Sequence, residues 1–434
     1  MEYNGGSLTA DHLCVLVHGL WGNPNHMKNV AKQLRETHSE DKLYILVAKR
    51  NSGSFTYDGI ERGGERVCLE IEEELESIRN RGGNITKISI VGYSLGGLVA
   101  RYAVGLLEMR GIFREVEPIN FTTFATPHLG VRTPLHGFHN HIWNVLGART
   151  LSMSGRQLFL IDEFRDTGRP LLAALADPES IFISGLKRFK RRILYANIVN
   201  DRSVVYYTAC MSRIDPYANL NRIEPNYLKG YEDVVLNPIK PISLVNKKSE
   251  PMTVSRKLNY LRNRWMFALA VFLPIGVVAF LLNAVVQTFR SSKRIRLHES
   301  GLAGIQIENY RSPIWLKELR GTVEDAYESL NNQQEEAYIR PWDNDNRYGR
   351  LESSEARILQ RERRNSSSQF PTLSLALSQF TMIDELDKLG WRKYSVWIHN
   401  VRTSHAAIIV RTDSERLKEG YVVLRHWLKE EFLI

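Results

Sequence analysis

One serine, enclosed by glycines between an apolar run and a helical run, constrains this chain more than any other feature. Gly92 and Gly96 stand two residues before and two residues after Ser94. In so tight a turn the serine backbone is strained, and a Cβ on either glycine would collide with the neighbouring strand or helix. The pattern therefore predicts a strand over residues 88–91, a sharp turn at Ser94 and a helix over 95–109.

The rest of the chain continues this alternation of strand and helix. Strand-like apolar runs lie at residues 13–17, 43–48, 119–124 and 192–199, and helical spacing is found at 24–37 and 60–79. Near the C-terminus, a helix over about 377–389, a strand over 394–398 and a closing helix over about 421–432 are expected. Strands that alternate with helices indicate an α/β fold, in which a mostly parallel sheet is flanked by helices.

The loop after the first strand has the composition of an anion-binding turn. The pentapeptide alone also fits a Gly-rich turn with an idle serine, but the strand before it and the helix after it favour a nucleophile. A serine that attacks an acyl group needs backbone N–H donors where negative charge develops on the substrate oxygen. We expect Leu20, in the HGLWG run of residues 18–22, and Leu95, at the start of the helix after Ser94, to supply them. His18 is expected only to order the loop.

An acidic partner for the site is expected after the strand at residues 192–199. In this strand–turn–helix setting the catalytic residues follow in the order Ser, then Asp or Glu, then His. Asp201 follows that strand directly, so its carboxylate should emerge at the same edge of the sheet as Ser94. Asp215 and Asp233 are the alternatives.

Twelve histidines compete for the role of base. His405 is expected in a loop after the last strand, where a free imidazole can reach the serine. His399 lies at the end of that strand and His426 lies in a helix, and both positions suit a base less well. The predicted catalytic set is therefore Ser94, Asp201 and His405.

The positive charge of the chain is concentrated around one apolar segment. The formal net charge is +10, which by itself suggests nucleic-acid binding. Ten basic residues and one acidic residue lie between positions 247 and 296, however, and inside that stretch residues 265–289 carry no charge. Basic residues on both sides of an apolar run favour anionic lipid headgroups, and we expect no nucleic-acid partner.

The uncharged segment is long enough to cross a bilayer, since about 20 helical residues suffice. A single crossing would leave His405 on the opposite side of the membrane from Ser94 and Asp201. We therefore predict a hairpin that bends near residues 274–276, where proline and glycine interrupt the run, and leaves by the face it entered. The competing interpretation is a buried core helix or a hydrophobic cap.

These patterns divide the chain into four parts. Residues 1–245 are the predicted catalytic core, in which about 131–190 form a cap with an apolar wall for an acyl chain or simply pack as core helices. Residues 246–300 are the basic-flanked apolar membrane segment, and 301–370, which are rich in polar residues, are an insertion or linker. Residues 371–434 complete the core. The cap side chains of interest are Leu135, Phe138, Ile142, Trp143, Val145 and Leu146.

The sequence resembles the fungal lipid-droplet phospholipase group within the putative serine esterases of the α/β-hydrolase superfamily. The stretches that carry the resemblance include HLCVLVHGLWGNPNHM, ISIVGYSLGGLVARYAVGLL, FTTFATPHLGVR and ILYANIVNDRSV, and they cover most of residues 11–235. Many relatives have His where this chain has Tyr93, a position that usually varies in the pentapeptide. The resemblance implies an α/β-hydrolase fold with Ser94, Asp201 and His405 as the triad.

The resemblance also implies a serine acyl hydrolase that acts on glycerophospholipids at a droplet or membrane surface. Its partners would be a phospholipid or neutral-lipid substrate and an anionic membrane or droplet surface; no protein partner is identified. The expected location is the lipid droplet and also the endoplasmic reticulum membrane, with the catalytic domain facing the cytosol. A triacylglycerol lipase, an acyl-protein thioesterase and a catalytically silent membrane adaptor are the alternatives. The mechanism requires no cofactor and no metal.

Overall fold

The computed structural model describes residues 3–131, 152–245, 286–302, 370–401 and 403–434, together with residues 310, 338, 358, 361–362 and 365–366. The predicted cap side chains at 135–146, residues 265–285 of the predicted hairpin and most of the predicted linker at 301–370 lie outside the described residues. Among the helices of the described ranges, none combines the length and the apolar character needed to cross a membrane.

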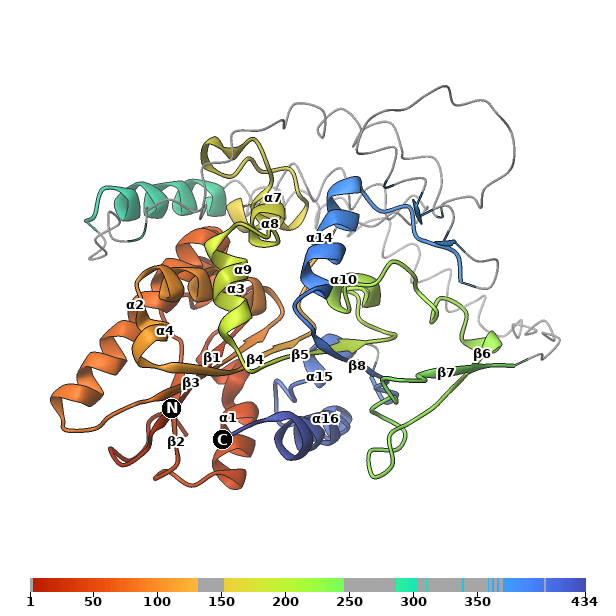
Figure 1. The fold of residues 1–434 in the computed structure, drawn as a ribbon, viewed down its shortest axis with the longest axis horizontal. Coiled ribbons are helices and arrows are strands. Elements are labelled where there is room, and N and C mark those ends of the chain that lie inside the picture. The colour runs from red at the N-terminus through yellow and green to blue at the C-terminus, as the bar shows by residue number, and fades with distance from the viewer. Residues whose placement is uncertain are drawn as a thin grey trace, which may run out of the picture.

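Six strands form one parallel sheet in the order β2-β1-β3-β4-β5-β8 (Figure 1). Their bounds are His12–Val17 for β1, Leu43–Val47 for β2, Lys87–Tyr93 for β3, Glu117–Phe124 for β4, Arg191–Asn197 for β5 and Arg392–Val396 for β8. All-apolar runs such as LCVLV and LYILV suit strands that are buried on both faces. The prediction of an α/β fold with a mostly parallel sheet is confirmed, and β8 comes from the C-terminal part of the chain.

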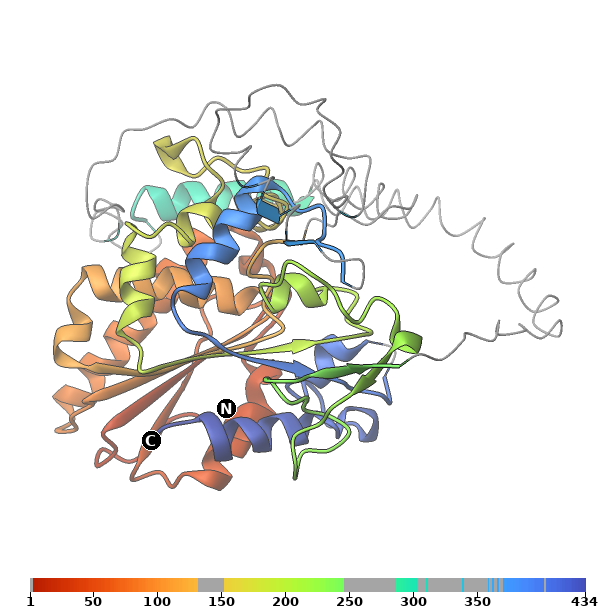
Figure 2. The same cartoon turned by 45° about the vertical axis from the view of Figure 1, so that its right-hand side comes forward.

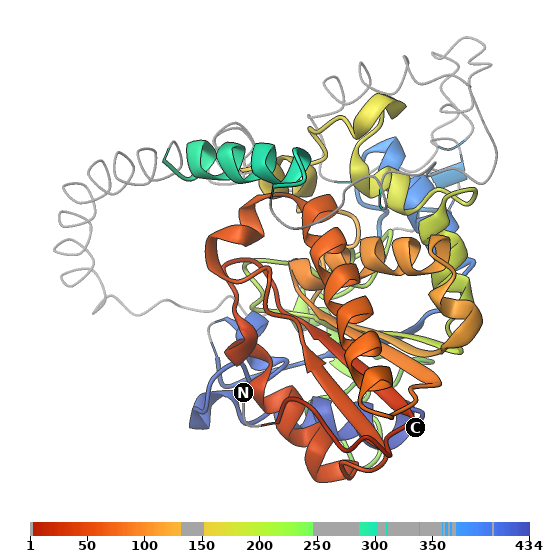
Figure 3. The ribbon, with the colours of Figure 1, turned by 90° about the vertical axis from the view of Figure 1, so that its left-hand side faces the viewer.

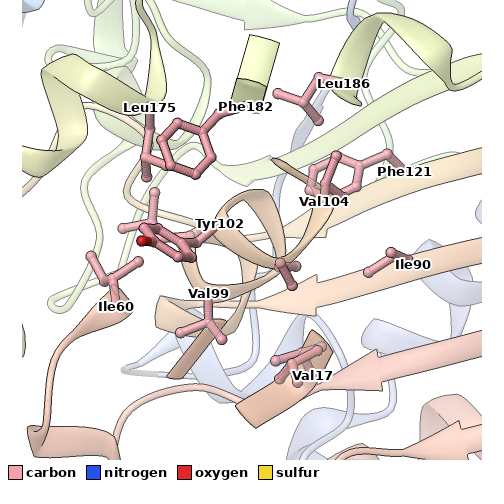
Figure 4. Close-up of a cluster of buried hydrophobic side chains, with 14 of the residues drawn as sticks. Val17, Ile60, Ile90, Val99, Tyr102, Val104, Phe121, Leu175, Phe182 and Leu186 are labelled. Atoms are coloured by element: carbon pink, nitrogen blue, oxygen red, sulfur yellow. The ribbon is translucent and has the colours of Figure 1, made fainter. Parts of the chain in front are cut away.

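Helices cover both faces of this sheet (Figures 1 and 2). One face carries α2 (Ile60–Asn80), α3 (Leu95–Met109), α9 (Ile181–Arg188) and α14 (Leu377–Asp387), and the other carries α1 (Lys28–Thr37) and α16 (Gly420–His426). Between α3 and α9, the ring of Tyr102 packs against Phe182 at 4.8 Å between centroids (Figure 4). Each face therefore has its own apolar core, and the sheet separates the two.

The shorter elements connect these layers. A two-stranded antiparallel sheet of β6 (Ile223–Pro225) and β7 (Ile242–Leu244) stands apart from the main sheet. The short helices are α4 (Ile112–Glu115), α7 (Met153–Leu158), α8 (Leu171–Leu175), α10 (Tyr206–Ala209) and α15 (Ser404–Ala407). The 3₁₀ turns are η1 (Pro24–Met27), η2 (Gly53–Tyr57), η4 (Arg165–Thr167), η5 (Leu220–Arg222) and η8 (Glu415–Leu417), and η9 (Trp427–Glu431) is a π turn.

Two predicted helices differ from expectation at one end. The helix expected over residues 24–37 opens as the 3₁₀ turn η1, because Pro24 begins it and the side chain of Asn23 caps the N–H of Asn25. The closing helix expected over 421–432 is split into α16 and η9, and the N–H of Phe432 donates to the carbonyl of Trp427 at 2.8 Å. In both places the apolar periodicity identified the helix but not its hydrogen-bond pattern.

Candidate active site

Ser94 sits in the sharp turn that the sequence predicts between β3 and α3. Its φ is 56° and its ψ is −129°, a backbone conformation that residues other than glycine rarely adopt. A Cβ on Gly92 would lie 2.3 Å from the Cα of Gly97, and a Cβ on Gly96 would lie 2.3 Å from the carbonyl oxygen of Val17. The glycines are therefore required by close packing, and the strain at Ser94 is held by the surrounding backbone.

The structure brings Ser94, His405 and Asp201 together, although 311 residues separate the first two. Nε2 of His405 lies 2.9 Å from Oγ of Ser94, and Nδ1 lies 2.9 Å from Oδ2 of Asp201. Because a carboxylate only accepts hydrogen bonds, Nδ1–H donates to Asp201 and Nε2 is left to accept the proton of the serine hydroxyl. The side chains of His405 and Asp201 are 12% and 2% exposed, so the carboxylate is shielded and the imidazole borders solvent.

Backbone and side-chain donors hold the Asp201 carboxylate after β5. Oδ1 accepts the N–H groups of Ser203 and Val204 at 3.0 and 2.8 Å, and Oδ2 accepts Nδ2 of Asn197 at 2.9 Å. Charged acceptors gain most from such donors, so these bonds fix the direction in which Asp201 faces the imidazole. Sequence reasoning missed Asn197, because an amide at the end of a buried strand carries no signal by itself.

The two alternative carboxylates lie elsewhere. Asp233 is exposed in a turn with a φ of 65°. Asp215 accepts the N–H of Tyr217 at 3.1 Å, and burial raises its pKa to about 6. Neither forms a hydrogen bond with His405 among those found in the described residues.

His405 lies in a single helical turn, α15, and not in the loop that the sequence predicted. Ser404 ties this turn to the Asp201 loop: its Oγ donates to the carbonyl of Val199 at 2.7 Å and its N–H donates to the carbonyl of Asn200 at 3.0 Å. Ser404 is the first residue of α15, where the N–H has no acceptor inside the helix, so the bond to Asn200 satisfies it.

Tyr93, the residue before the nucleophile, contacts the same turn. Its hydroxyl donates to the carbonyl of His405 at 3.0 Å, and the two rings are 5.1 Å apart between centroids. Burial raises the pKa of the Tyr93 hydroxyl, which keeps it protonated as a donor. Tyr93 thus joins the strand of the serine to the turn of the histidine, a contact between residues 312 positions apart that local sequence patterns do not reveal.

The loop of residues 18–22 lies directly against the serine. A Cβ on Gly19 would come within 2.7 Å of Cβ and 3.2 Å of Oγ of Ser94, so only glycine allows this approach. Among the described residues, none accepts a hydrogen bond from the N–H of Leu20. The N–H of Leu95 is the first of α3, where no intrahelical acceptor exists. Leu20 follows the glycine that contacts Ser94, and Leu95 follows Ser94 itself; that their N–H groups bind an oxyanion stays a prediction.

His18 has the ordering role that the sequence predicted and no contact with the serine hydroxyl. Its Nδ1 lies 3.1 Å from the carbonyl oxygen of Gly19, and a Cβ on Gly22 would lie 2.6 Å from the same nitrogen. Burial lowers the pKa of His18, so the imidazole is neutral at pH 7. His399 pairs with Glu419, and His426 lies 2.7 Å from the hydroxyl of Tyr195, so neither serves Ser94.

Within the ranges that the structure describes, no three or more His, Cys, Asp or Glu side chains are grouped as the ligands of a metal ion would be. Cys14, Cys68 and Cys210 are free and buried.

Comparison with known proteins finds a family of esterases and fungal relatives with lipase names. Residues 7–213, just under half of the chain, match the family described as "Putative serine esterase (DUF676)". "Putative lipase ROG1" of Saccharomyces cerevisiae is 35% identical over 211 residues, which are 47% of this chain and 29% of the relative. "Putative lipase C4A8.10" of Schizosaccharomyces pombe is 29% identical over 244 residues, which are 53% of this chain and 30% of the relative. The chain thus spans about three tenths of the length of these relatives.

Among solved structures, Est1E from Butyrivibrio proteoclasticus with bound ferulic acid is 16% identical. The match covers 46% of this chain and 73% of that chain, with a TM-score of 0.29. A likeness of that size says nothing about the chemistry of this chain.

Proposed function

Because residues 7–213 of this chain belong to the putative serine esterase family, we propose that the protein is a serine acyl hydrolase. Its reaction would be the cleavage of fatty acyl esters of glycerophospholipids at a lipid-droplet or membrane surface. The single observation that carries the proposal is the hydrogen-bonded series from Ser94 through His405 to Asp201, with 2.9 Å at each step. A nucleophile, a base and an orienting carboxylate in that order are what acyl transfer to a serine requires.

The proposed mechanism follows from these contacts. As Oγ of Ser94 attacks the ester carbonyl, Nε2 of His405 takes the hydroxyl proton, and Asp201 stabilises the imidazolium. The N–H groups of Leu20 and Leu95 stabilise the oxyanion. Collapse of the tetrahedral intermediate breaks the ester bond, and the imidazolium protonates the departing alcohol. Water, deprotonated by His405, then attacks the acyl-serine. The bond from the acyl carbon to Oγ breaks, the fatty acid leaves, and the imidazolium returns its proton to Oγ of Ser94.

A lipid substrate is supported by the sequence around the apolar segment and by the names of the fungal relatives. Residues 265–289 carry no charge, and basic residues on both sides would face anionic headgroups. We propose that this segment enters and leaves the lipid by one face, with the catalytic domain in the cytosol at the droplet or the endoplasmic reticulum. The contact of Ser94 with His405 supports this topology, because the two residues lie on either side of the segment in the sequence.

A direct test is to incubate the purified protein with mixed phospholipids and triacylglycerol and to identify the products by mass spectrometry. We expect free fatty acid and lysophospholipid from the wild type, and neither from Ser94→Ala. Release of diacylglycerol instead would identify a triacylglycerol lipase, and turnover of acyl-protein substrates alone would identify a thioesterase. If Ser94→Ala still released fatty acid, the nucleophile would be another residue. If the wild type released none from any substrate, the silent adaptor would be the better account.

A further inference from the structure

Residues 286–299, the described end of the apolar segment and its basic flank, form a helix beside the N-terminal end of α2 (Figure 3). The inner face of this helix is fixed by buried polar contacts. Oδ1 of Asp58 accepts Oγ of Ser291 and Nη2 of Arg294, both at 2.8 Å, and Asp58 is 0% exposed. One to two turns further on, Nε2 of His298 lies 2.6 Å from Oε2 of Glu65, and both side chains are almost fully buried.

Such contacts fix the helix in one orientation. The second oxygen of Asp58 accepts Nη2 of Arg66 at 2.8 Å, so a single buried carboxylate lies between two guanidinium groups. Removing one partner of a buried charge pair is costly because it leaves the other charge without compensation. The helix cannot roll on α2 without breaking this set, so its opposite face is held outward.

That opposite face, which we call the outer face, combines basic and apolar side chains. Its members are Val286, Phe289, Arg290, Lys293, Arg296 and Leu297. The ring of Phe289 is 75% exposed, and the three basic residues recur at every third position. Among the described residues, no carboxylate forms an ion pair with any of the three. A large exposed aromatic ring among unpaired cations is unusual on a surface that faces only water.

We propose that the outer face binds an anionic lipid surface. Exposed apolar side chains set among basic ones are the composition of helices that lie in a membrane interface. Nucleic acid would use the cations but would leave Phe289 and Val286 in water. The helix includes residues 286–289, the last four of the uncharged run in the sequence, so the end of that run and its basic flank lie on one helix. This inference rests on the proposed function and names the surface through which the enzyme reaches its substrate.

The helix of residues 286–299 is joined to the loop of residues 18–22 through η2. Nη2 of Arg294 donates to the carbonyl of Ser54 at 2.8 Å, and the guanidinium groups of Arg294 and Arg66 lie 5.1 and 5.0 Å from the ring centre of Phe55. The hydroxyl of Thr56 then accepts the N–H of Trp21 at 3.1 Å.

A second bond connects the same two segments, since the N–H of Gly53 donates to the carbonyl of Gly22 at 2.7 Å. Trp21, next to the predicted donor Leu20, is 61% exposed. The outer face is therefore linked through η2 to the loop of residues 18–22, and docking would hold that loop near the lipid.

The test is flotation of the full chain with vesicles of phosphatidylcholine, with and without phosphatidylserine. It is performed in the Ser94→Ala background so that no lipid is consumed. The first variant removes the three outer cations as Arg290→Gln, Lys293→Gln and Arg296→Gln. The matched control removes three exposed cations elsewhere as Lys42→Gln, Arg114→Gln and Lys229→Gln. The same sets in the wild-type background are assayed on a water-soluble short-chain ester.

With phosphatidylserine present, the outer-face variant should bind about a hundredfold more weakly, since each basic residue near an anionic surface contributes about 1 kcal/mol. Vesicle binding by the control variant should change less than about threefold. Hydrolysis of the soluble ester by either variant should also change less than about threefold, because the replaced side chains are exposed and outside the site. Phe289→Ser should weaken binding to both kinds of vesicle.

Three results would overturn the inference. The first is equal vesicle binding by the outer-face variant and the control variant. The second is binding by the Ser94→Ala protein that does not depend on phosphatidylserine, and the third is an outer-face variant that loses binding to a single-stranded oligonucleotide but keeps binding to vesicles. Failure of the proposed hydrolase is seen separately. In that case the soluble ester is not cleaved by the wild type while vesicle binding still depends on the outer face.

Discussion

The serine side and the histidine side of the site are built in different ways. Ser94 is held by backbone that crowds it from every side: the N–H of Ser94 donates to the carbonyl of Phe124 at 2.9 Å, and Gly19, Gly92 and Gly96 leave no room for a Cβ. His405 is held by a one-turn helix and a few long-range hydrogen bonds, chiefly those of Ser404 and Tyr93.

Damage to the two sides should therefore affect stability and activity differently. Close packing of backbone cannot relax by small steps, so damage on the serine side should reduce both folding and activity. Hydrogen bonds that join distant segments can be removed one at a time, so damage on the histidine side should reduce activity more than stability.

Replacing His405 by Ala should lower kcat/KM on a soluble ester by about ten-thousandfold, because a serine without its base loses most of its nucleophilicity. The melting temperature should stay within a few degrees of the wild type, since the imidazole borders solvent. A variant that keeps more than a tenth of the activity would show that another residue is the base.

Acid should destabilise the folded chain through two buried histidines. Burial lowers the pKa of His12, in β1, and of His426, in α16, from 6.5 to about 4. Both imidazoles are neutral in the folded state, so above pH 6.5 their burial hardly lowers the free energy of unfolding. Below it the unfolded chain binds more protons, and stability falls as the pH drops toward 4. Between pH 7 and pH 5 each should cost about 2 kcal/mol of unfolding free energy.

Urea titrations at pH 7 and pH 5 measure this loss. His12→Gln and His426→Gln should each lose about 2 kcal/mol less than the wild type does over the same interval, because glutamine does not titrate. A variant that loses as much as the wild type would contradict the assignment for that histidine.

Replacing Gly97 by Ala tests the packing on the serine side. The new Cβ would lie 2.1 Å from Oγ1 of Thr126, which belongs to the turn after β4, so the elbow or that turn must move. We expect a loss of about 1–3 kcal/mol in stability and about a hundredfold in kcat. Chemical denaturation and ester hydrolysis on the same preparation measure both. A loss of activity without loss of stability would contradict the contrast drawn above.

Replacing Tyr93 by Phe removes one bond that connects the two sides. The carbonyl of His405 loses its donor, and we expect kcat to fall about tenfold with KM unchanged, as for the loss of a net 1 kcal/mol or so. Tyr44→Phe, which removes a hydroxyl bound to Glu74 far from the site, is the matched control and should leave kcat unchanged. Equal kinetics of the two variants would mean that Tyr93 does not position the histidine.

Sequence reasoning reached the parts of the site that depend on local chemistry. The strained turn at Ser94, the glycine loop before it and the carboxylate after β5 each follow from a few consecutive residues. It missed the bonds that orient them. Tyr93 and Ser404 act on partners that only the fold brings near, and the amide of Asn197, four positions before Asp201, carries no signal by itself. It also expected a loop at His405, since nothing in RTSHAA indicates the bonds of Ser404 to Val199 and Asn200, which are about 200 positions away in the sequence.

The central claim is that Ser94 is made reactive by a histidine 311 residues away. Labelling of the folded protein with a fluorophosphonate, followed by peptide mapping, tests it most directly. We predict covalent label on Ser94 in the wild type, none in Ser94→Ala, and labelling slowed at least a hundredfold in His405→Ala, because an unactivated serine reacts poorly. Label on a different residue, or equal labelling rates with and without the imidazole, would contradict the account.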